Sequence, residues 1–154
     1  MSNIVMPSVS VDASCRGNPG PMEYKGVHTE SGATIFHKRF EEGTNNIGEF
    51  LAIVHAAALL KQNSMSMPIY SDSEIAILWV KRKRCNTNLI KNDRNEEVFA
   101  MTKRAVKWLR NNWIENNILK WNTRKHGEIP ADFGRKHNFT GKGKYDLCTE
   151  AAKT

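Results

Sequence analysis

Four carboxylic acids stand at predicted ends of strands and helices, where side chains from distant parts of a chain can meet. They are Asp12, Glu49, Asp72 and Asp132. Carboxylate oxygens are hard ligands, which suit Mg²⁺ or Mn²⁺ better than Zn²⁺. Two such ions about 4 Å apart can activate a water and stabilise a departing oxygen in phosphodiester cleavage.

The chain carries 23 Lys and Arg against 16 Asp and Glu, a formal net charge of +7. This basic balance suits an acidic polymer, so we expect a metal site that cuts phosphodiester bonds.

Asp12 lies in residues 9–20, VSVDASCRGNPG, the stretch around which the rest of the chain is organised. Val9, Val11 and Ala13 alternate with polar residues, which is the period of a strand, and a turn-rich run follows. Asp12 is therefore expected near the end of a strand. In an open sheet flanked by helices, ligands collect beyond the carboxyl ends of strands. The alternative is a surface Asp beside an ordinary hairpin.

Asp72 directly follows a short apolar strand predicted over 67–71. If that strand ran parallel to the first, Asp12 and Asp72 would lie side by side, and a cation or a proton would have to relieve their repulsion. Glu49 lies in the first turn of a helix predicted over 47–62. It is either a surface acid favoured by the helix dipole or, because it precedes Ile53 by one turn, an acid that leans toward the buried stripe.

The spacing of apolar residues predicts the other elements. Strands are expected at 4–13, 23–29 and 33–41 as an antiparallel meander, helices at 73–84 and 95–112, and a last strand at 118–122. Pro130 suits the first turn of a short helix, which would place Asp132 in that turn and Glu128 just before it.

Several further residues have ordinary structural interpretations. Ile75, Leu78 and Trp79 are the predicted apolar positions of the helix over 73–84. Trp108 and Trp113 are expected in the core or at its edge rather than as platforms for bases. The basic run 81–84 either complements the helix dipole or contacts nucleic acid, and charge alone leaves both open.

The length of 154 residues predicts one domain. No apolar run approaches the roughly 20 residues that span a bilayer, and the N-terminus lacks the pattern of a signal peptide, so we expect a cytoplasmic protein that does not bind membranes. Cys15, Cys85 and Cys148 lack zinc-site spacing and are interpreted as free thiols. Residues 138–154 show no periodicity and are expected to form a mobile tail.

The chain resembles type 1 ribonuclease H, and specifically its short bacterial kind. The resemblance is carried by VDASCRGNPG, YKGV, GTNNIGEFLAIVHA, IYSDS, ILKWNT and GEIPADFGRK, and it covers residues 9–136 in the family's order. It implies an α/β fold with a five-stranded mixed sheet, order 3-2-1-4-5, helices on both faces and a catalytic domain over 1–137. It also implies Mg²⁺-dependent endonucleolytic cleavage of the RNA strand of RNA/DNA hybrids, leaving 3′-hydroxyl and 5′-phosphate ends, by a monomer.

The resemblance also implies roles for five acids. Asp12 matches the acid that bridges two Mg²⁺ ions, for which Mn²⁺ can substitute. Glu49 and Asp72 match ligands of the ion nearer the leaving group. Asp132 matches a ligand of the nucleophile-side ion, and Glu128 matches an acid that assists that ion and product release.

A second set of residues matches positions that contact nucleic acid in the family. The turn that meets the RNA strand in the minor groove is matched by Ser14, Gly17, Asn18 and Pro19, and neighbouring nucleotide contacts by Asn45 and Glu74. A pocket for a DNA phosphate is matched by Thr44, Asn46, Thr87 and Thr123, and a wall of the DNA channel by Trp79. Close backbone approach at Gly17 suits recognition of the 2′-hydroxyl, which distinguishes RNA from DNA.

The chain departs from many relatives at three places. His126 is the only histidine of a short loop where relatives carry a catalytic His on a longer one, so it is either catalytic or incidental. Glu74 stands where Gln or Asn is common. Residues 82–92 are too few for the basic handle of some relatives, and we expect no separate hybrid-binding domain before Val9. The alternatives are a resolvase- or integrase-like nuclease of the same fold and a non-catalytic hybrid-binding module.

Overall fold

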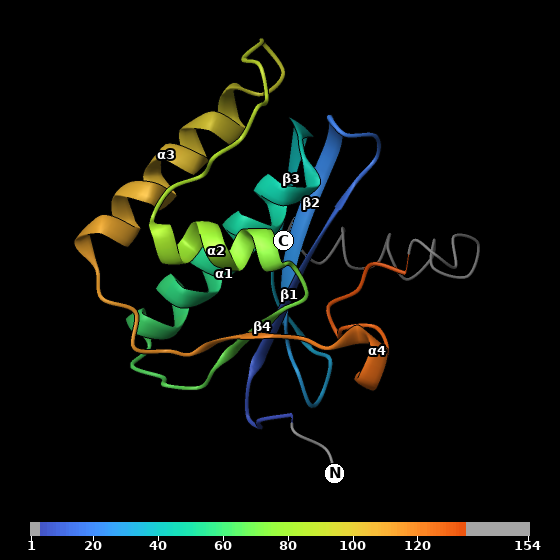
Figure 1. Ribbon diagram of the computed structural model, residues 1–154, viewed down its shortest axis with the longest axis vertical. Coiled ribbons are helices and arrows are strands. Elements are labelled where there is room, and N and C mark those ends of the chain that lie inside the picture. The colour runs from blue at the N-terminus through green and yellow to red at the C-terminus, as the bar shows by residue number, and fades with distance from the viewer. Residues whose placement is uncertain (1–3, 135–154) are drawn as a thin grey trace.

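A computed structural model of the chain describes residues 4–134, which form one five-stranded sheet with helices packed against it (Figure 1). The elements are β1 (Val9–Cys15), β2 (Gly20–His28), β3 (Thr34–Gly43), α1 (Asn45–Gln62), β4 (Ile69–Ser71), α2 (Glu74–Arg82), α3 (Glu96–Asn111), β5 (Ile118–Lys120) and α4 (Thr123–His126). The strand order is β3-β2-β1-β4-β5. The first three strands pair antiparallel, while β4 pairs parallel with both β1 and β5. The predicted mixed sheet and its order are confirmed.

Helix α1 is buried between the sheet and the helices α2 and α3 (Figure 1). Its inner side packs on Val9, Val11 and Ala13 of β1, the apolar face predicted from their alternation. Gly48 permits this close approach, because a Cβ atom there would lie 2.8 Å from the Cβ of Ala13. The start of α1 is thereby held against β1, at the level of Glu49.

The opposite face of the sheet is covered by the chain that follows β5. Tyr70, Trp121 and Ile129 form a second, smaller apolar cluster there. Further along, Phe133 packs over Lys25 and His37 of β2 and β3. The segment after β5 therefore crosses from the β4–β5 side of this face to the β2–β3 side.

Some predicted boundaries were wrong, for identifiable reasons. Strand β1 begins at Val9 rather than residue 4, because pairing with both neighbouring strands starts there. Helix α1 begins two residues earlier than predicted, since the hydroxyl of Thr44 accepts a hydrogen bond from the Ile47 amide at 3.2 Å and caps the helix.

The helix predicted after Pro130 was also wrong for the described residues. Up to Gly134 the chain forms only a turn, closed by the Asp132 amide donating to the Ile129 carbonyl at 2.8 Å. A single-turn helix, α4, lies earlier and is capped by the side chain of Asn122. Four residues are too few to produce a helical period, so the sequence pattern did not reveal it.

The prediction of apolar, inward-facing positions in α2 was wrong for two residues, Ile75 and Leu78. Ile75 and Leu78 are 48% and 43% exposed, and the buried side is formed by Ala76, Ile77 and Val80. This buried side belongs to the core in which α2 packs against α1. Trp113, expected at the core edge, is 75% exposed because it lies beyond the end of α3. Trp108 does pack against the core.

Within residues 4–134, no helix is both long and apolar enough to cross a membrane. Cys15 and Cys85 are free thiols, as predicted. Cys148, the expected tail 138–154 and the end of the expected catalytic domain at residue 137 lie outside the described residues.

Candidate active site

Asp12 and Asp72 are brought together by the parallel pairing of β1 with β4. Ser10 pairs with Tyr70, and each acid lies two residues further along its own chain. Asp72 follows the last residue of β4, as predicted. Asp12 lies in the middle of β1 rather than near its end, because β1 continues beyond β4 as the antiparallel partner of β2. The predicted juxtaposition of these two acids is confirmed.

Glu49 completes a compact group of three acids. Asp12, Glu49 and Asp72 each offer a carboxylate oxygen, and these oxygens lie within 4.8 Å of one another. Asp12 and Glu49 are buried, and Asp72 is half-buried. The Oε1 atom of Glu49 has no hydrogen-bond partner although it is buried. A buried carboxylate oxygen without a partner is unfavourable unless a cation or a proton occupies the space beside it.

The electrostatics of this group fit a cation. Burial, followed by repulsion from Asp72, raises the pKa of Asp12 to about 8. Burial and the charge of Asp12 raise the pKa of Glu49 well above its ordinary value. Burial and the charge of Asp132 raise the pKa of Asp72. Three carboxyl groups this close cannot all ionise at neutral pH unless positive charge balances them, and hard divalent ions supply that balance.

Asp132 and Glu128 lie beside this group rather than within it. The charges of both raise the pKa of Asp72, and that of Asp132 also raises the pKa of Asp12. Asp132 lies on the irregular segment that follows α4, where its Oδ2 accepts a hydrogen bond from the Gly134 amide at 2.8 Å. The pKa of Asp72 is lowered in turn by a backbone hydrogen bond and, to a smaller extent, by the charge of Lys120 at the end of β5. The other four predicted acids therefore lie close enough to Asp72 to interact with it, either in the three-acid group or through their charges.

A hollow of about 460 Å³ lies between the start of α1 and the loop that joins α2 to α3. It gathers residues predicted to contact nucleic acid from four parts of the chain: Asn18, Pro19, Thr44, Asn46, Trp79 and Thr87. Trp79 is held in its wall by an edge-to-face contact with Phe50. Thr123, predicted for the same phosphate pocket, does not line this hollow, since it begins α4.

The remaining predicted contacts lie in or near the turn before β2, except for Glu74. Gly17 has a φ of +88°, a left-handed conformation that other residues rarely adopt. Ser14 is buried, and its hydroxyl has no hydrogen-bond partner. Asn18 reaches the start of α1, where its Oδ1 accepts a hydrogen bond from the Asn45 amide at 3.0 Å. Glu74 is exposed at the start of α2.

The sequence matches the RNase H family over residues 7–126. The chain belongs to the RNase H family. Ribonuclease H of Neorickettsia sennetsu is 33% identical over 67 residues, which are 42% of this chain and 44% of that protein. The match thus spans less than half the length of this curated relative.

Solved structures of RNase H proteins are also similar to this chain. RNase H1 from the halophilic archaeon Halobacterium salinarum aligns with a TM-score of 0.53 and 17% identity, covering 80% of this chain and 91% of that one. LC11-RNase H1, solved in complex with an RNA/DNA hybrid, aligns with a TM-score of 0.49 and 22% identity, covering 79% and 89%. The archaeal likeness supports the RNase H fold.

One wall of the hollow in this RNase H chain was missed by sequence reasoning. Glu42, at the end of β3, accepts hydrogen bonds from the side chains of Asn92 at 2.7 Å, Asn95 at 3.0 Å and Arg94 at 3.2 Å. These bonds, that of Asn92 first, lower the pKa of Glu42. They tie the loop between α2 and α3 to the sheet. The available signal in the sequence was the high density of Asn in residues 86–95.

His126 lies half-buried at the end of α4, outside the group of acids. Its ring packs against Trp121, with 5.5 Å between the ring centroids. The Trp121 indole N–H donates to the Gly127 carbonyl at 2.9 Å, which orders this loop. The packing against Trp121 accounts for the burial of His126. A catalytic role of His126 stays a prediction.

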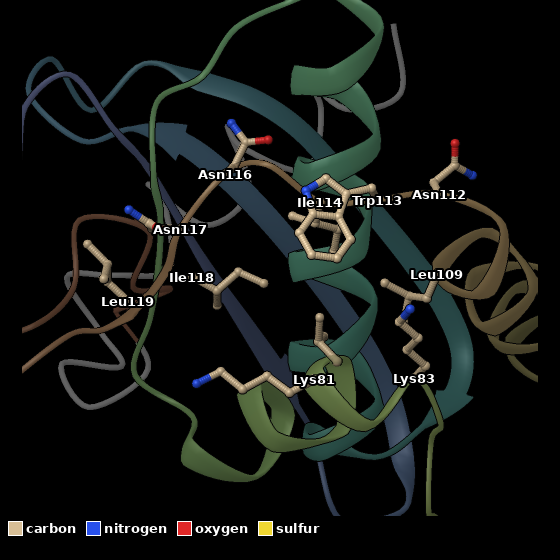
Figure 2. A pocket seen from close by; sticks show the side chains of 11 residues that line it. Lys81, Lys83, Leu109, Asn112, Trp113, Ile114, Asn116, Asn117, Ile118 and Leu119 are labelled. Atoms are coloured by element: carbon tan, nitrogen blue, oxygen red, sulfur yellow. The ribbon is translucent and has the colours of Figure 1, made fainter.

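A second hollow, of about 400 Å³, lies where the C-terminal ends of α2 and α3 approach β5 (Figure 2). Its lining is largely apolar, with Trp113 at one side and the side chains of Lys81 and Lys83 at another. None of the five predicted acids lines it. It is therefore separate from the candidate active site.

Proposed function

We propose that this RNase H chain is an endoribonuclease that hydrolyses the RNA strand of RNA/DNA hybrids by two-metal-ion catalysis. The observation that carries the proposal is the group formed by Asp12, Glu49 and Asp72, whose carboxylate oxygens lie within 4.8 Å of one another. The buried, unpartnered oxygen of Glu49 and the raised pKa values fit divalent ions. Membership of the RNase H family supports the substrate class.

In this proposal the acids divide between two ions. Asp12 would contact both, Glu49 and Asp72 the ion nearer the leaving group, and Asp132 the other, with Glu128 assisting. Two divalent ions, Mg²⁺ or Mn²⁺ in its place, would supply an activated water and charge stabilisation, leaving a 3′-hydroxyl and a 5′-phosphate. The half-buried Asp72 and Asp132 border the solvent, so a phosphate could reach the group from that side.

Other residues of the chain would bind and orient the hybrid. Ser14 and the turn at Gly17 would meet the minor groove, where the 2′-hydroxyl identifies the RNA strand. The hollow at Thr44 and Thr87 would hold a phosphate of the DNA strand. The start of α1 favours such an anion, because the helix dipole presents positive charge there. These contacts would fix which strand lies over the acids.

The direct test compares labelled RNA/DNA hybrid, double-stranded RNA and double-stranded DNA as substrates in the presence of Mg²⁺. We expect cleavage of the hybrid only, with 5′-phosphate and 3′-hydroxyl products identified from end-labelled RNA. Asp72→Asn should lose cleavage and keep hybrid binding. Asp93→Asn is the matched control, because Asp93 is exposed on the loop between α2 and α3.

The other outcomes distinguish the alternatives. Cleavage of double-stranded DNA would favour a resolvase- or integrase-like nuclease. Hybrid binding without cleavage at any Mg²⁺ or Mn²⁺ concentration would favour a non-catalytic binding module, and full activity of Asp72→Asn would remove the proposed metal site.

A further inference from the structure

Asp132 differs from the other acids in how it is held. Asp12 and Glu49 lie within a strand and a helix, and Asp72 directly follows a strand, whereas Asp132 belongs to a turn followed by irregular chain. Backbone hydrogen bonds of a sheet or helix therefore do not define its position. The buried residues on either side of it, Ala131 and Phe133, are 0% and 4% exposed and must supply the anchoring.

Phe133 packs on residues of a row that runs across the strands of the sheet. Asp12 of β1 lies directly opposite Lys25 of β2, and Lys25 lies directly opposite His37 of β3. The Phe133 ring lies with its centroid 4.7 Å from the Lys25 Nζ and 5.9 Å from the centroid of the His37 ring. Phe133 thus covers two positions of a row whose third position is Asp12. The preceding residue, Asp132, is consequently held close to Asp12.

Lys25 and His37, on which Phe133 packs, are themselves held by buried polar contacts. The His37 Nε2 pairs with the Glu23 Oε1, and both side chains are buried. Lys25 is also buried, so its ammonium group lies against the face of the Phe133 ring rather than in open water. A cation desolvated over an aromatic face is more strongly attracted than an exposed one. Lys25 and His37 therefore prefer an aromatic ring at position 133 over an aliphatic side chain of similar volume.

We propose that Phe133, seated on Lys25 and His37, is the positioning residue for Asp132 in the active site. The inference rests on the proposed function for the role of Asp132 as a metal ligand. One oxygen of that ligand, Oδ2, already accepts the Gly134 N–H, so the orientation of its carboxylate depends on the local backbone. Loss of the ring contact would release this backbone while the three-acid group remains in place.

The test compares Phe133→Leu with Phe40→Leu. Phe40 is equally buried, at 5% exposed, but it lies in the core on the opposite face of the sheet. Each variant is first shown to be folded by circular dichroism. Substitution of residues that orient metal ligands typically weakens metal affinity 10- to 100-fold. We expect Phe133→Leu to raise the half-saturating Mg²⁺ concentration for hybrid cleavage about tenfold, with unchanged hybrid affinity, and Phe40→Leu to change neither.

A second readout does not depend on cleavage. Mn²⁺ broadens NMR signals of nearby nuclei, so the Gly134 amide signal of the unmodified protein should be broadened together with that of Ser73. In Phe133→Leu the broadening of the Gly134 signal should be weaker, while that of the Ser73 signal should be unchanged. Lys25→Met, which keeps an unbranched side chain of similar length and removes the cation, should shift both readouts in the same direction by a smaller factor.

Equal broadening of Gly134 in Phe133→Leu and the unmodified protein would overturn the positioning role. So would equal shifts in metal dependence for Phe133→Leu and Phe40→Leu, or a Gly134 signal that Mn²⁺ leaves sharp in the unmodified protein. If Mn²⁺ broadens the signals as expected but no hybrid is cleaved, the proposed function fails and the positioning role of Phe133 stands.

Discussion

The side chain of Asn18 is joined to the backbone of Asn45, with 3.0 Å between the Asn18 Oδ1 and the Asn45 amide nitrogen. This hydrogen bond links the turn after β1 to the first residue of α1, 27 positions later. Under the proposed function, these two segments meet the two strands of the hybrid. The bond therefore couples the surface for the RNA strand to the surface for the DNA phosphate.

Asn18→Ala removes this link. We expect the free energy of unfolding to fall by about 1 kcal/mol, the usual worth of one such hydrogen bond, and hybrid affinity to fall about fivefold. Fluorescence anisotropy with a labelled hybrid, in Ca²⁺ to prevent cleavage, measures the affinity. Asn111→Ala, at the exposed end of α3, is the control and should leave the affinity unchanged. Unaltered binding by Asn18→Ala would show that the turn orders itself without this bond.

The hollow between α1 and the following loop gives a prediction for two threonines. Thr44→Ala loses the cap of α1 and should cost about 1 kcal/mol of stability, whereas Thr87 caps no helix and Thr87→Ala should cost less. Each substitution should lower hybrid affinity about fivefold, with metal binding intact.

Thr123→Ala should also weaken hybrid binding, but independently, because Thr123 lies outside the hollow. We expect the effects of Thr44→Ala and Thr87→Ala to be non-additive, and that of Thr123→Ala to add to either. Anisotropy titrations of the double variants measure this coupling. Wild-type hybrid affinity in all three single variants would contradict the assignment of a phosphate pocket.

Asp12→Asn tests the electrostatic cost of the acid group in metal-free protein. The pKa of Asp12 is about 8 in the folded protein and 3.8 ordinarily, so between these pH values the folded state keeps a proton that the unfolded state has lost. Stability therefore falls as pH rises from 4 to 8, and Asn, which cannot ionise, avoids that loss. At pH 8 we expect the variant to be more stable by on the order of 2 kcal/mol.

Urea unfolding in EDTA at pH 4 and pH 8 measures the difference, which should vanish at pH 4. Asp93→Asn, which removes an exposed carboxylate outside the acid group, is the control. Mg²⁺ should stabilise the unmodified protein more than Asp12→Asn. A stability difference that stays constant between pH 4 and pH 8 would contradict the raised pKa of Asp12.

His55 produces a pH dependence of opposite sign. Burial, and secondarily the charge of Lys38, lower the pKa of His55 to about 4. Its ring stacks on Phe36, and its Nδ1 hydrogen-bonds the Tyr24 hydroxyl at 2.8 Å. Below the ordinary pKa of 6.5 the unfolded state binds a proton that the folded state refuses until about pH 4, so stability falls as pH falls through this window.

His55→Gln removes this titration. Between pH 7 and pH 5 we expect the unmodified protein to lose about 2 kcal/mol more stability than the variant. Guanidinium unfolding at the two pH values measures the change, compared with His28→Gln, whose histidine lies at the end of β2 beside the exposed Ser31. Parallel pH profiles for unmodified protein and His55→Gln would contradict the shifted pKa.

Local patterns were sufficient to predict the sheet and the acids at its edge. Alternation at Val9, Val11 and Ala13 identified β1 and its buried face, and an apolar strand ending at Asp72 supplied its parallel neighbour. These predictions succeeded because a strand has a short period and its side chains point to two faces only. The family motifs then supplied the strand order and the roles of the acids.

The tertiary structure decided which surfaces are covered. Periodicity shows that a helix has two sides, but it does not show which neighbour packs there, so Ile75 and Leu78 were wrongly assigned to the buried side of α2. The polar residues Glu23, Lys25 and His37 resemble a solvated strand face in sequence, yet they are buried. Phe133 comes to lie over Lys25 and His37 from a segment more than ninety positions later, and no local pattern encodes that contact, because it depends on the path of the whole chain across the sheet.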